Sequence, residues 1–213
     1  MHIKEKKIGK VNWIGAATLF LKENRRFLKV YQQTILAPAF TTLLFFFVIN
    51  IAIKDRINYQ FDYINFLAPG LIVMAMMQNA FANTSSSLLS SKIAGNIQDL
   101  LMAPLNANEI IIAYSLAAII RAILVGVVTF ILITPFVNFN LFNFYYLIFY
   151  SILGTAFLSL VGLLAGLWAE KFDNMSGITN FIIVPLTFLS GTFYDVKRLP
   201  EPFYTISLYN PFY

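Results

Sequence analysis

The chain has 213 residues, of which 59% are hydrophobic and only 12% are charged, and its mean hydropathy is +0.72. Soluble domains carry about a quarter charged residues, so this composition excludes an ordinary soluble domain and predicts an all-α polytopic membrane protein. The chain has no cysteine, which excludes disulfides and thiolate metal sites. The net charge of +5 does not indicate nucleic-acid binding, because basic residues concentrate ahead of the first apolar segment, as in a cytoplasmic flank.

Residues 1–33 are predicted to form a basic tail and a cytoplasmic interfacial helix. Between Val11 and Gln33, mainly aromatic side chains share one side of a helical wheel, and the cations share the other. The two sets are Trp13, Ala17, Phe20, Phe27 and Tyr31, and Lys22, Arg25, Arg26 and Lys29. This pattern is typical of an amphipathic helix in the membrane interface, with its cations near anionic headgroups of the membrane lipid. The alternative is a surface helix packed on another domain, and the chain contains no such domain.

Five apolar segments are long enough to cross the hydrocarbon core, at about residues 34–53, 64–90, 110–133, 144–169 and 175–194. In the fourth, Gly162 and Gly166 make a small-residue face for close helix approach. In the fifth, Pro185 predicts a kink. A cytoplasmic N-terminus leaves most basic residues on the inner side, which satisfies the positive-inside rule.

The segment 195–213 is too polar and too rich in proline to cross the membrane. Its aromatic residues suit headgroup depth, so it predicts a re-entrant segment on the outer side. A sixth span is expected to begin after Asn210-Pro211, and the chain is therefore expected to be truncated before that span.

A polar segment separates the second and third spans and would lie on the cytoplasmic side. It opens with a helix-capping pattern, Asn96 with an acid three residues later, and repeats this pattern at Asn106 and Glu109. Between the caps, three apolar residues fall on one helix face and a proline then stops the helix. These residues are Ile97, Leu100, Leu101 and Pro104. We expect a short amphipathic helix over 96–104 whose apolar face is available to a partner; an ordinary interhelical loop is the alternative.

Two polar features lie inside the predicted spans. In the second span, polar residues recur at steps of three and four and form a stripe: Asn79, Asn83, Ser86, Ser87 and Ser90. Lipid cannot satisfy such groups, so the stripe faces another helix or a water-filled cavity. In the third span, Arg121 lies about 16 Å deep, and no predicted span contains an acid. Arg121 must then use carbonyls, Asn or Tyr groups, water or an anionic ligand, and both a substrate contact and a structural role are open.

The sequence lacks the motifs of an energy-converting enzyme. No lysine is followed by Ser or Thr, so the phosphate-binding loop of P-loop ATPases is absent. There is no HExxH motif, and no carboxylate pair lies inside the membrane. We therefore expect a protein without a catalytic or metal site of its own, which takes the energy for any uphill transport from another subunit.

Four stretches resemble a known family, the integral permease subunits of ABC-2 type exporters. They are NFLAPGLIVMAMMQ at 65–78, GNIQDLLMAPLNANE at 95–109, KFDNMS at 171–176 and PLTFLSGTFYDVKRLPEPFYTISLYNP at 185–211. The resemblance implies a six-helix half-transporter that works as a homodimer with two cytoplasmic ATPase subunits, which hold ATP and magnesium. It implies no cofactor in this chain, and it identifies the segment between the second and third spans as a coupling helix. The ATPase-coupling residues would be Asn96, Ile97, Gln98, Asp99, Leu100, Leu101 and Pro104.

The function implied by this resemblance is ATP-driven export of a lipid-linked polysaccharide, a drug or another amphiphile across a bacterial cytoplasmic (inner) membrane. Asn79, Asn83 and Arg121 are then candidate residues of the substrate pathway. A secondary transporter or channel, and a membrane scaffold that moves no cargo, are the alternatives. The sequence departs from the family pattern in its coupling segment, where Asp99 stands as a lone acid and members are often richer in Glu.

Overall fold

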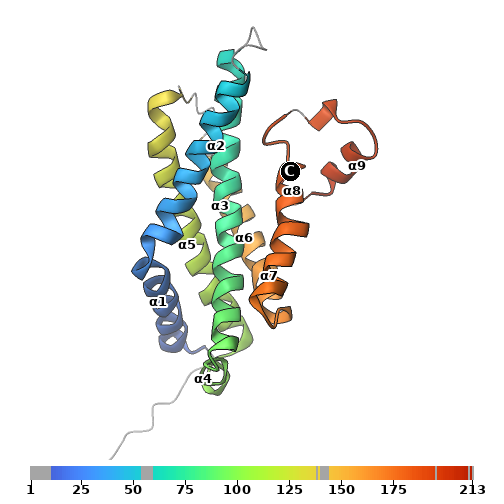
Figure 1. Ribbon diagram of the computed structural model, residues 1–213. Coiled ribbons are helices and arrows are strands. Elements are labelled where there is room, and N and C mark those ends of the chain that lie inside the picture. Colours follow the sequence, from blue (N-terminus) through green and yellow to red (C-terminus); the bar gives the residue numbers. More distant parts are fainter. Residues whose placement is uncertain are drawn as a thin grey trace, which may run out of the picture.

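The computed structural model describes residues 11–53, 60–137, 139, 144–194, 196–210 and 212. Within these ranges every regular element is a helix, which confirms the predicted all-α class (Figure 1). The predicted basic tail over residues 1–10 lies outside the described residues. The helices in chain order are α1 (Trp13–Lys29), the π-helix η1 (Gln32–Leu36), α2 (Ala37–Ile53), α3 (Gln60–Ile93), α4 (Ile97–Met102), α5 (Ala107–Ile133), the 3-10 helix η2 (Thr134–Phe136), α6 (Phe144–Trp168), α7 (Phe172–Ile178), the π-helix η3 (Thr179–Ile183), α8 (Val184–Phe188), the 3-10 helix η4 (Val196–Arg198) and α9 (Phe203–Leu208).

Four helical segments of the described chain are long and apolar enough to cross a membrane. They are Gln32–Ala52, Tyr63–Ile93, Ala107–Phe136 and Tyr145–Trp168. Their bounds agree with the first four predicted spans to within a few residues. The agreement is close because a segment that crosses the hydrocarbon core must be apolar over the whole thickness of that core, and hydropathy measures this property.

The predicted fifth span ends earlier than expected. Its helical part consists of α7, η3 and α8, with 7, 5 and 5 residues, and it stops at Phe188 rather than at 194. At ~1.5 Å per residue this run is about 25 Å long, less than a ~30 Å hydrocarbon core. The chain turns away at Gly191, which has a left-handed φ of 78°, and the Ser190 and Thr192 hydroxyl oxygens lie 2.7 Å apart across the turn.

Prolines explain two irregular helical turns. Pro38 follows η1 and Pro185 follows η3, so each proline lies just beyond a π-helical turn. Proline has no N–H for the carbonyl four residues earlier, and a wider turn is one way to accommodate that loss. The kink predicted at Pro185 is therefore seen as a π-helical distortion.

The most extensive contact in the bundle joins α3 and α6, and α3 also packs on α5 (Figure 1). The small-residue face predicted on α6 makes this contact possible. A Cβ on Gly162 would lie 2.5 Å from the Phe81 carbonyl oxygen, and a Cβ on Gly166 would lie 3.0 Å from that of Ser85. The two backbones therefore approach closely, as in other small-residue helix pairs in membranes.

Hydrogen bonds secure the same helix pair at two levels. The Thr84 hydroxyl donates to the Ser159 carbonyl at 2.8 Å. At the end of α3, the Lys92 ammonium donates to the carbonyls of Leu167 at 2.8 Å and of Ala169 at 2.5 Å. A cation at these carbonyls satisfies the open C-terminal end of α6 and complements its dipole. Lys92 thus has a structural role that its place in a polar loop did not indicate.

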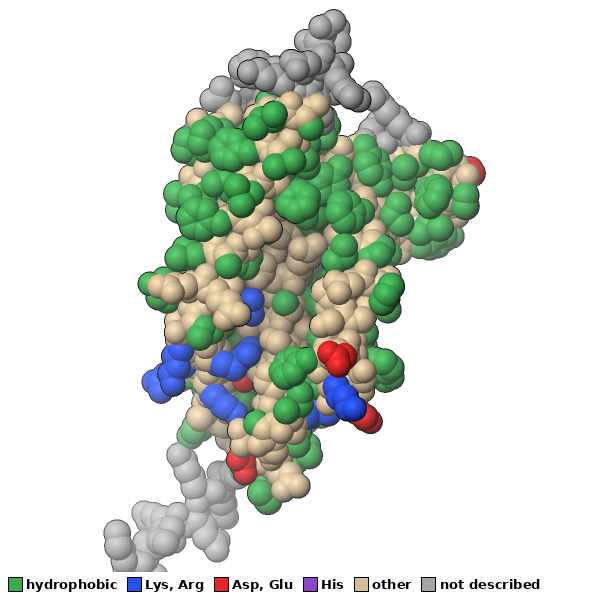
Figure 2. Space-filling view, viewed as in Figure 1, with side chains coloured by type: hydrophobic (Ala, Val, Ile, Leu, Met, Phe, Trp, Pro, Cys, Tyr) green, Lys and Arg blue, Asp and Glu red, His purple; other side chains and the backbone are tan. Residues whose placement is uncertain are grey.

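The basic side chains on the face drawn in Figure 2 gather at one end of the bundle. Figure 2 shows the basic side chains in the lower half of the molecule, around α1 and beside the start of α7, while hydrophobic side chains cover the upper part. In Figure 1, α4 lies at this same lower end. This distribution is the one expected for a helical bundle whose charged end lies at a membrane surface.

Gly162 offers a direct test of the α3–α6 contact. We expect Gly162→Ala to lower the free energy of unfolding by about 1–3 kcal/mol, because the new methyl group meets the backbone of α3. Thermal unfolding of the purified protein in detergent measures this change. Gly177→Ala is the matched control, since a Cβ there meets nothing within 4 Å. Equal unfolding temperatures for the two variants would contradict the close approach.

Candidate functional site

The predicted segment 96–104 folds as a short helix, α4, whose six residues are Ile97–Met102. Its first predicted cap is wrong. Asn96 occupies the N-cap position but has helical φ and ψ of −77° and −2°, and its side chain makes no capping hydrogen bond. A capping side chain needs an extended backbone to reach back to the helix, so Asp99 has no reciprocal partner there.

The apolar face of α4 is divided differently from the prediction. Ile97 and Leu100 are partly buried against a hydrophobic cluster that includes Leu19 of α1. Leu101 and Met102 instead point outward and are 72% and 76% exposed. Leu100 is therefore turned toward the protein, and the apolar pair open to a partner is Leu101 with Met102. Gln98, Asp99 and Pro104 are exposed on the same helix and loop.

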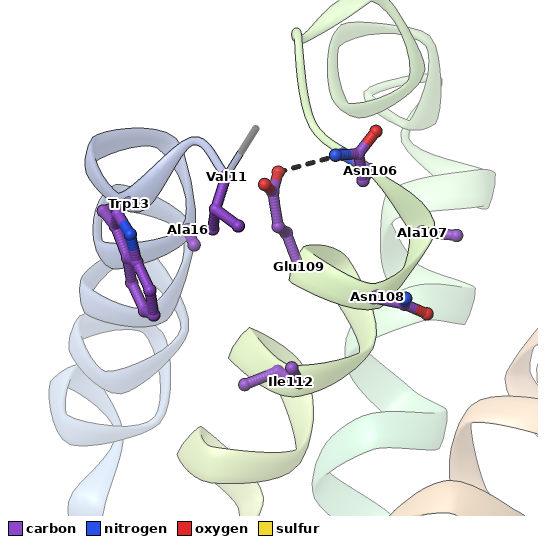
Figure 3. A pocket seen from close by; sticks show the side chains of 8 residues that line it. All are labelled: Val11, Trp13, Ala16, Asn106, Ala107, Asn108, Glu109 and Ile112. Atoms are coloured by element: carbon purple, nitrogen blue, oxygen red, sulfur yellow. Dashed lines mark hydrogen bonds between the residues drawn. The ribbon is translucent and has the colours of Figure 1, made fainter. Parts of the chain in front are cut away.

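The second predicted cap is confirmed, and it does more than end a loop. Glu109 and Asn106 form a capping box in which the Asn106 backbone N–H donates to Glu109 Oε2 at 2.9 Å. The other carboxylate oxygen, Oε1, accepts the backbone N–H of Asn12 at 2.7 Å. One carboxylate thus binds the start of α5 and the residue that precedes α1. Figure 3 shows Glu109 between these two segments, in the wall of a cavity of about 520 Å³.

Asn12 completes the junction between α1 and the loop that connects α4 to α5. Its side-chain NH2 donates to the Pro104 carbonyl at 2.9 Å, and its Oδ1 accepts the Gly15 N–H at 3.0 Å as the N-cap of α1. Gly15 leaves no room for a side chain against Leu105, since a Cβ would lie 2.7 Å from it. The start of α1 and the end of the loop between α4 and α5 are therefore joined by hydrogen bonds and close packing. The capping box was visible in the sequence, but its contact with Asn12, 97 residues away, was not.

The second candidate region is a buried polar cluster, formed by Glu23, Arg26, Asn79, Asn83, Ser87 and Arg121. Arg121 donates from Nη2 to Asn79 Oδ1 at 3.1 Å and from Nη1 to Asn83 Oδ1 at 3.3 Å. Its Nε donates to the Thr34 carbonyl at 3.3 Å. That carbonyl lies four residues before Pro38, which has no N–H to give it. Arg121 is thus satisfied by a carbonyl and two Asn side chains, as the sequence required of it.

Two residues of α1 join the cluster against expectation. Arg26 was predicted to face lipid headgroups, but its Nη2 donates to Asn83 Oδ1 at 2.9 Å. Glu23, which the sequence interpretation passed over, is 1% exposed and accepts from Arg26 Nε at 3.1 Å and from the Ser87 hydroxyl at 2.6 Å. The i, i+3 spacing of Glu23 and Arg26 was the available signal. Helical-wheel analysis missed it because it grouped Arg26 with the exposed cations.

The polar stripe of α3 therefore faces α1 and α5, and the structure brings Asn79, Asn83 and Arg121 together. All three are at most 8% exposed, and the oxygens of both Asn side chains are bonded to guanidinium groups. This arrangement is helix-to-helix hydrogen bonding, one of the two uses that the sequence left open. Among the described residues, no group of three or more His, Cys, Asp or Glu side chains could hold a metal ion.

The fold and these two regions define a class: a polytopic helical membrane protein with a short, partly exposed amphipathic helix between two long spans. Residues 16–213 match the ABC-2 type transporter family. The chain is 34% identical over 201 residues to the inner membrane transport permease YadH of Escherichia coli strain K12, covering 93% of this chain and 78% of the relative. Relatives of the same name in Escherichia coli O157:H7 and Shigella flexneri match to the same extent. No solved structure matches it. The chain belongs to the ABC-2 type transporter family.

The junction at Glu109 predicts a change in hydrogen exchange. Replacing Glu109 by Ala removes the acceptor of two backbone N–H groups, so we expect several-fold faster amide exchange at Asn12 and Asn106. Hydrogen–deuterium exchange with mass spectrometry on peptides covering both helix starts measures this. Asn108→Ala, a change at an exposed neighbour, should leave the exchange unaltered. Unchanged exchange in the Glu109 variant would mean that the junction is held by other contacts.

The hydrogen bonds of Arg121 predict that its removal lowers the stability of the protein. We expect Arg121→Ala to lower the free energy of unfolding by about 1–3 kcal/mol, because it removes interhelical hydrogen bonds to Asn79 and Asn83 and leaves the Asn79 oxygen buried without a donor. Thermal unfolding in detergent measures the change, and Lys171→Ala, at an exposed basic residue, is the control. A double-mutant cycle with Asn79→Ala should show coupling; additive effects would argue against a direct bond.

Proposed function

We propose that this protein is the membrane-spanning permease subunit of an ATP-driven exporter, energised by a separate cytoplasmic ATPase. Membership of the ABC-2 type transporter family and the permease name of its relatives support a transport role. The observation that best supports an ATPase partner is the Leu101–Met102 pair, two large apolar side chains exposed at the charged end of the bundle. A partner surface that covers them would gain the free energy of burying both.

The connections of α4 suit it to receive a mechanical push. Only three residues separate Ile93, the end of α3, from α4, and four separate α4 from Ala107, the start of α5. The Glu109 and Asn12 hydrogen bonds extend the same unit to α1. In the proposed cycle, closure of the ATPase moves α4, and α3 and α5 tilt with it to open a pathway outward.

The polar cluster has a supporting part in this proposal. Asn79, Asn83 and Arg121 bind one another rather than an open cavity, so they are proposed to keep α1, α3 and α5 together during the tilt. Other side chains would then contact the cargo. The proposed cargo class is a lipid-linked polysaccharide, a drug or another amphiphile, which suits a pathway surrounded by apolar helices.

The assembly and placement follow from the same proposal. The protein would lie in a bacterial inner membrane with its N-terminus and α4 in the cytoplasm, as the positive-inside rule favours. Two copies would form the pathway between them, and ATP with magnesium would bind in the partner ATPase alone. The charged end of the bundle, where α1 and α4 lie, would then be the cytoplasmic end.

Replacing Leu101 and Met102 together by Asp tests the docking surface. We expect this variant to lose co-purification with its ATPase partner and to lose export, because the apolar contact becomes a charged one. Phe172→Ser removes an apolar side chain, 53% exposed in α7, and is the control. Retained ATPase binding in the double variant would refute docking at α4. Transport that continues without any ATPase would instead indicate a channel or a secondary transporter. If the protein transports no cargo at all, it would be a membrane scaffold.

A further inference from the structure

The buried polar cluster carries unbalanced charge. Its one carboxylate, Glu23, forms an ion pair with Arg26, and the two guanidinium groups of Arg26 and Arg121 converge on Asn83 Oδ1 at 2.9 and 3.3 Å. The other acceptors of Arg121 are the neutral Thr34 carbonyl and the Asn79 amide. In the described part of the chain the cluster therefore holds two cations and one anion. An excess charge among apolar helices is costly unless a counter-charge approaches.

The cluster opens to the surface of the bundle at Arg26. Arg121 and Glu23 are 8% and 1% exposed, whereas the Arg26 side chain is 35% exposed. A counter-ion from outside can therefore reach the cluster along α1, where the guanidinium of Arg26 is partly open.

The surface around Arg26 is basic. Lys22 lies four residues before it and Lys29 three residues after it, so both share its side of α1. Arg25, the preceding residue, extends the basic surface, and all three of these cations are exposed. The acid of α1, Glu23, is buried against α3 and does not offset them. Figure 2 shows the resulting group of basic side chains at the level of α1.

The same helix exposes an apolar stripe beside these cations. Ile14, Leu21 and Leu28 recur at a spacing of seven and are 61%, 51% and 48% exposed. Lys29 lies three residues before the span Gln32–Ala52, which places the basic surface at the edge of the hydrocarbon core. Cations and exposed aliphatic side chains at this depth match a phosphate and its acyl chains.

We propose that the exposed cations Lys22, Arg25 and Lys29, beside the partly exposed Arg26, bind the phosphate of an anionic phospholipid. The phosphate supplies the negative charge that the cluster lacks, and the acyl chains lie along Leu21 and Leu28. The lipid then holds α1 against α3, at the same place where Arg26 binds Asn83. This site goes beyond the proposed export function and does not depend on it, because it requires only a bilayer with anionic lipid.

Site-directed fluorescence quenching tests the proposal on the full chain. The sequence has two tryptophans, Trp13 and Trp168, so the variant Trp13→Phe, Trp168→Phe, Leu28→Trp carries one reporter beside the basic surface. It is reconstituted in phosphatidylcholine vesicles that contain brominated phosphatidylglycerol or brominated phosphatidylcholine. We expect preferential quenching by the anionic lipid. Each cation near the surface contributes ~1 kcal/mol, so removing one should weaken the preference about fivefold.

The decisive variant adds Lys22→Gln, Arg25→Gln and Lys29→Gln, which should abolish the preference while the protein remains monodisperse. Lys171→Gln removes an exposed cation elsewhere on the chain and should preserve it. Equal quenching by both lipids in the parent reporter would overturn the proposal. So would an equal loss with Lys171→Gln, which would indicate only the general surface potential. A preference that survives the triple substitution would also overturn it, and would leave the basic surface for an acidic protein partner.

Discussion

A guanidinium in the middle of an apolar helix needs acceptors, because lipid offers none and an unsatisfied cation there is costly. Arg121 finds its acceptors on two neighbouring elements, the Thr34 carbonyl of η1 and the amide oxygens of Asn79 and Asn83 on α3. The carbonyl is available because Pro38 cannot bond it. A helix-breaking residue in one span therefore supplies an acceptor to a charge in another, and α5 is tied to both.

The buried polar groups of α1 also need hydrogen-bond partners. Asn83 accepts Arg26 as well as Arg121, and Ser87 donates to Glu23, so the second half of α1 is bonded to α3. Asn12, the N-cap residue of α1, is bonded to Glu109 of α5 and to the Pro104 carbonyl in the loop before α5. Held at both ends, α1 belongs to the bundle rather than only to the membrane surface. Short connections join α4 to α3 and α5, and hydrogen bonds join α1 to α3 and α5, so these four helices are linked to one another.

The sequence predicted the features that depend on local composition. Hydropathy located the first four spans to within a few residues, and the capping pattern of Asn106 and Glu109 located the start of α5. The small residues of α6 predicted its close approach, and the lack of acids in the spans excluded an acidic partner for Arg121 within them. Each of these rests on residues near one another in the chain, or on a rule that the bilayer imposes on every segment alike.

Tertiary structure decided which side of each element faces its neighbour. A helical wheel cannot show that Arg26 turns inward to Asn83 while Arg25 stays exposed, or that Leu100 packs on α1 while Leu101 points outward. Likewise, no local pattern connects Glu109 with Asn12, 97 residues away. The sequence by itself determined an all-helical membrane protein with a short amphipathic helix between two spans. The packing of α1 against α3 and α5 decided its partners, because a buried polar group bonds whatever the fold brings within reach.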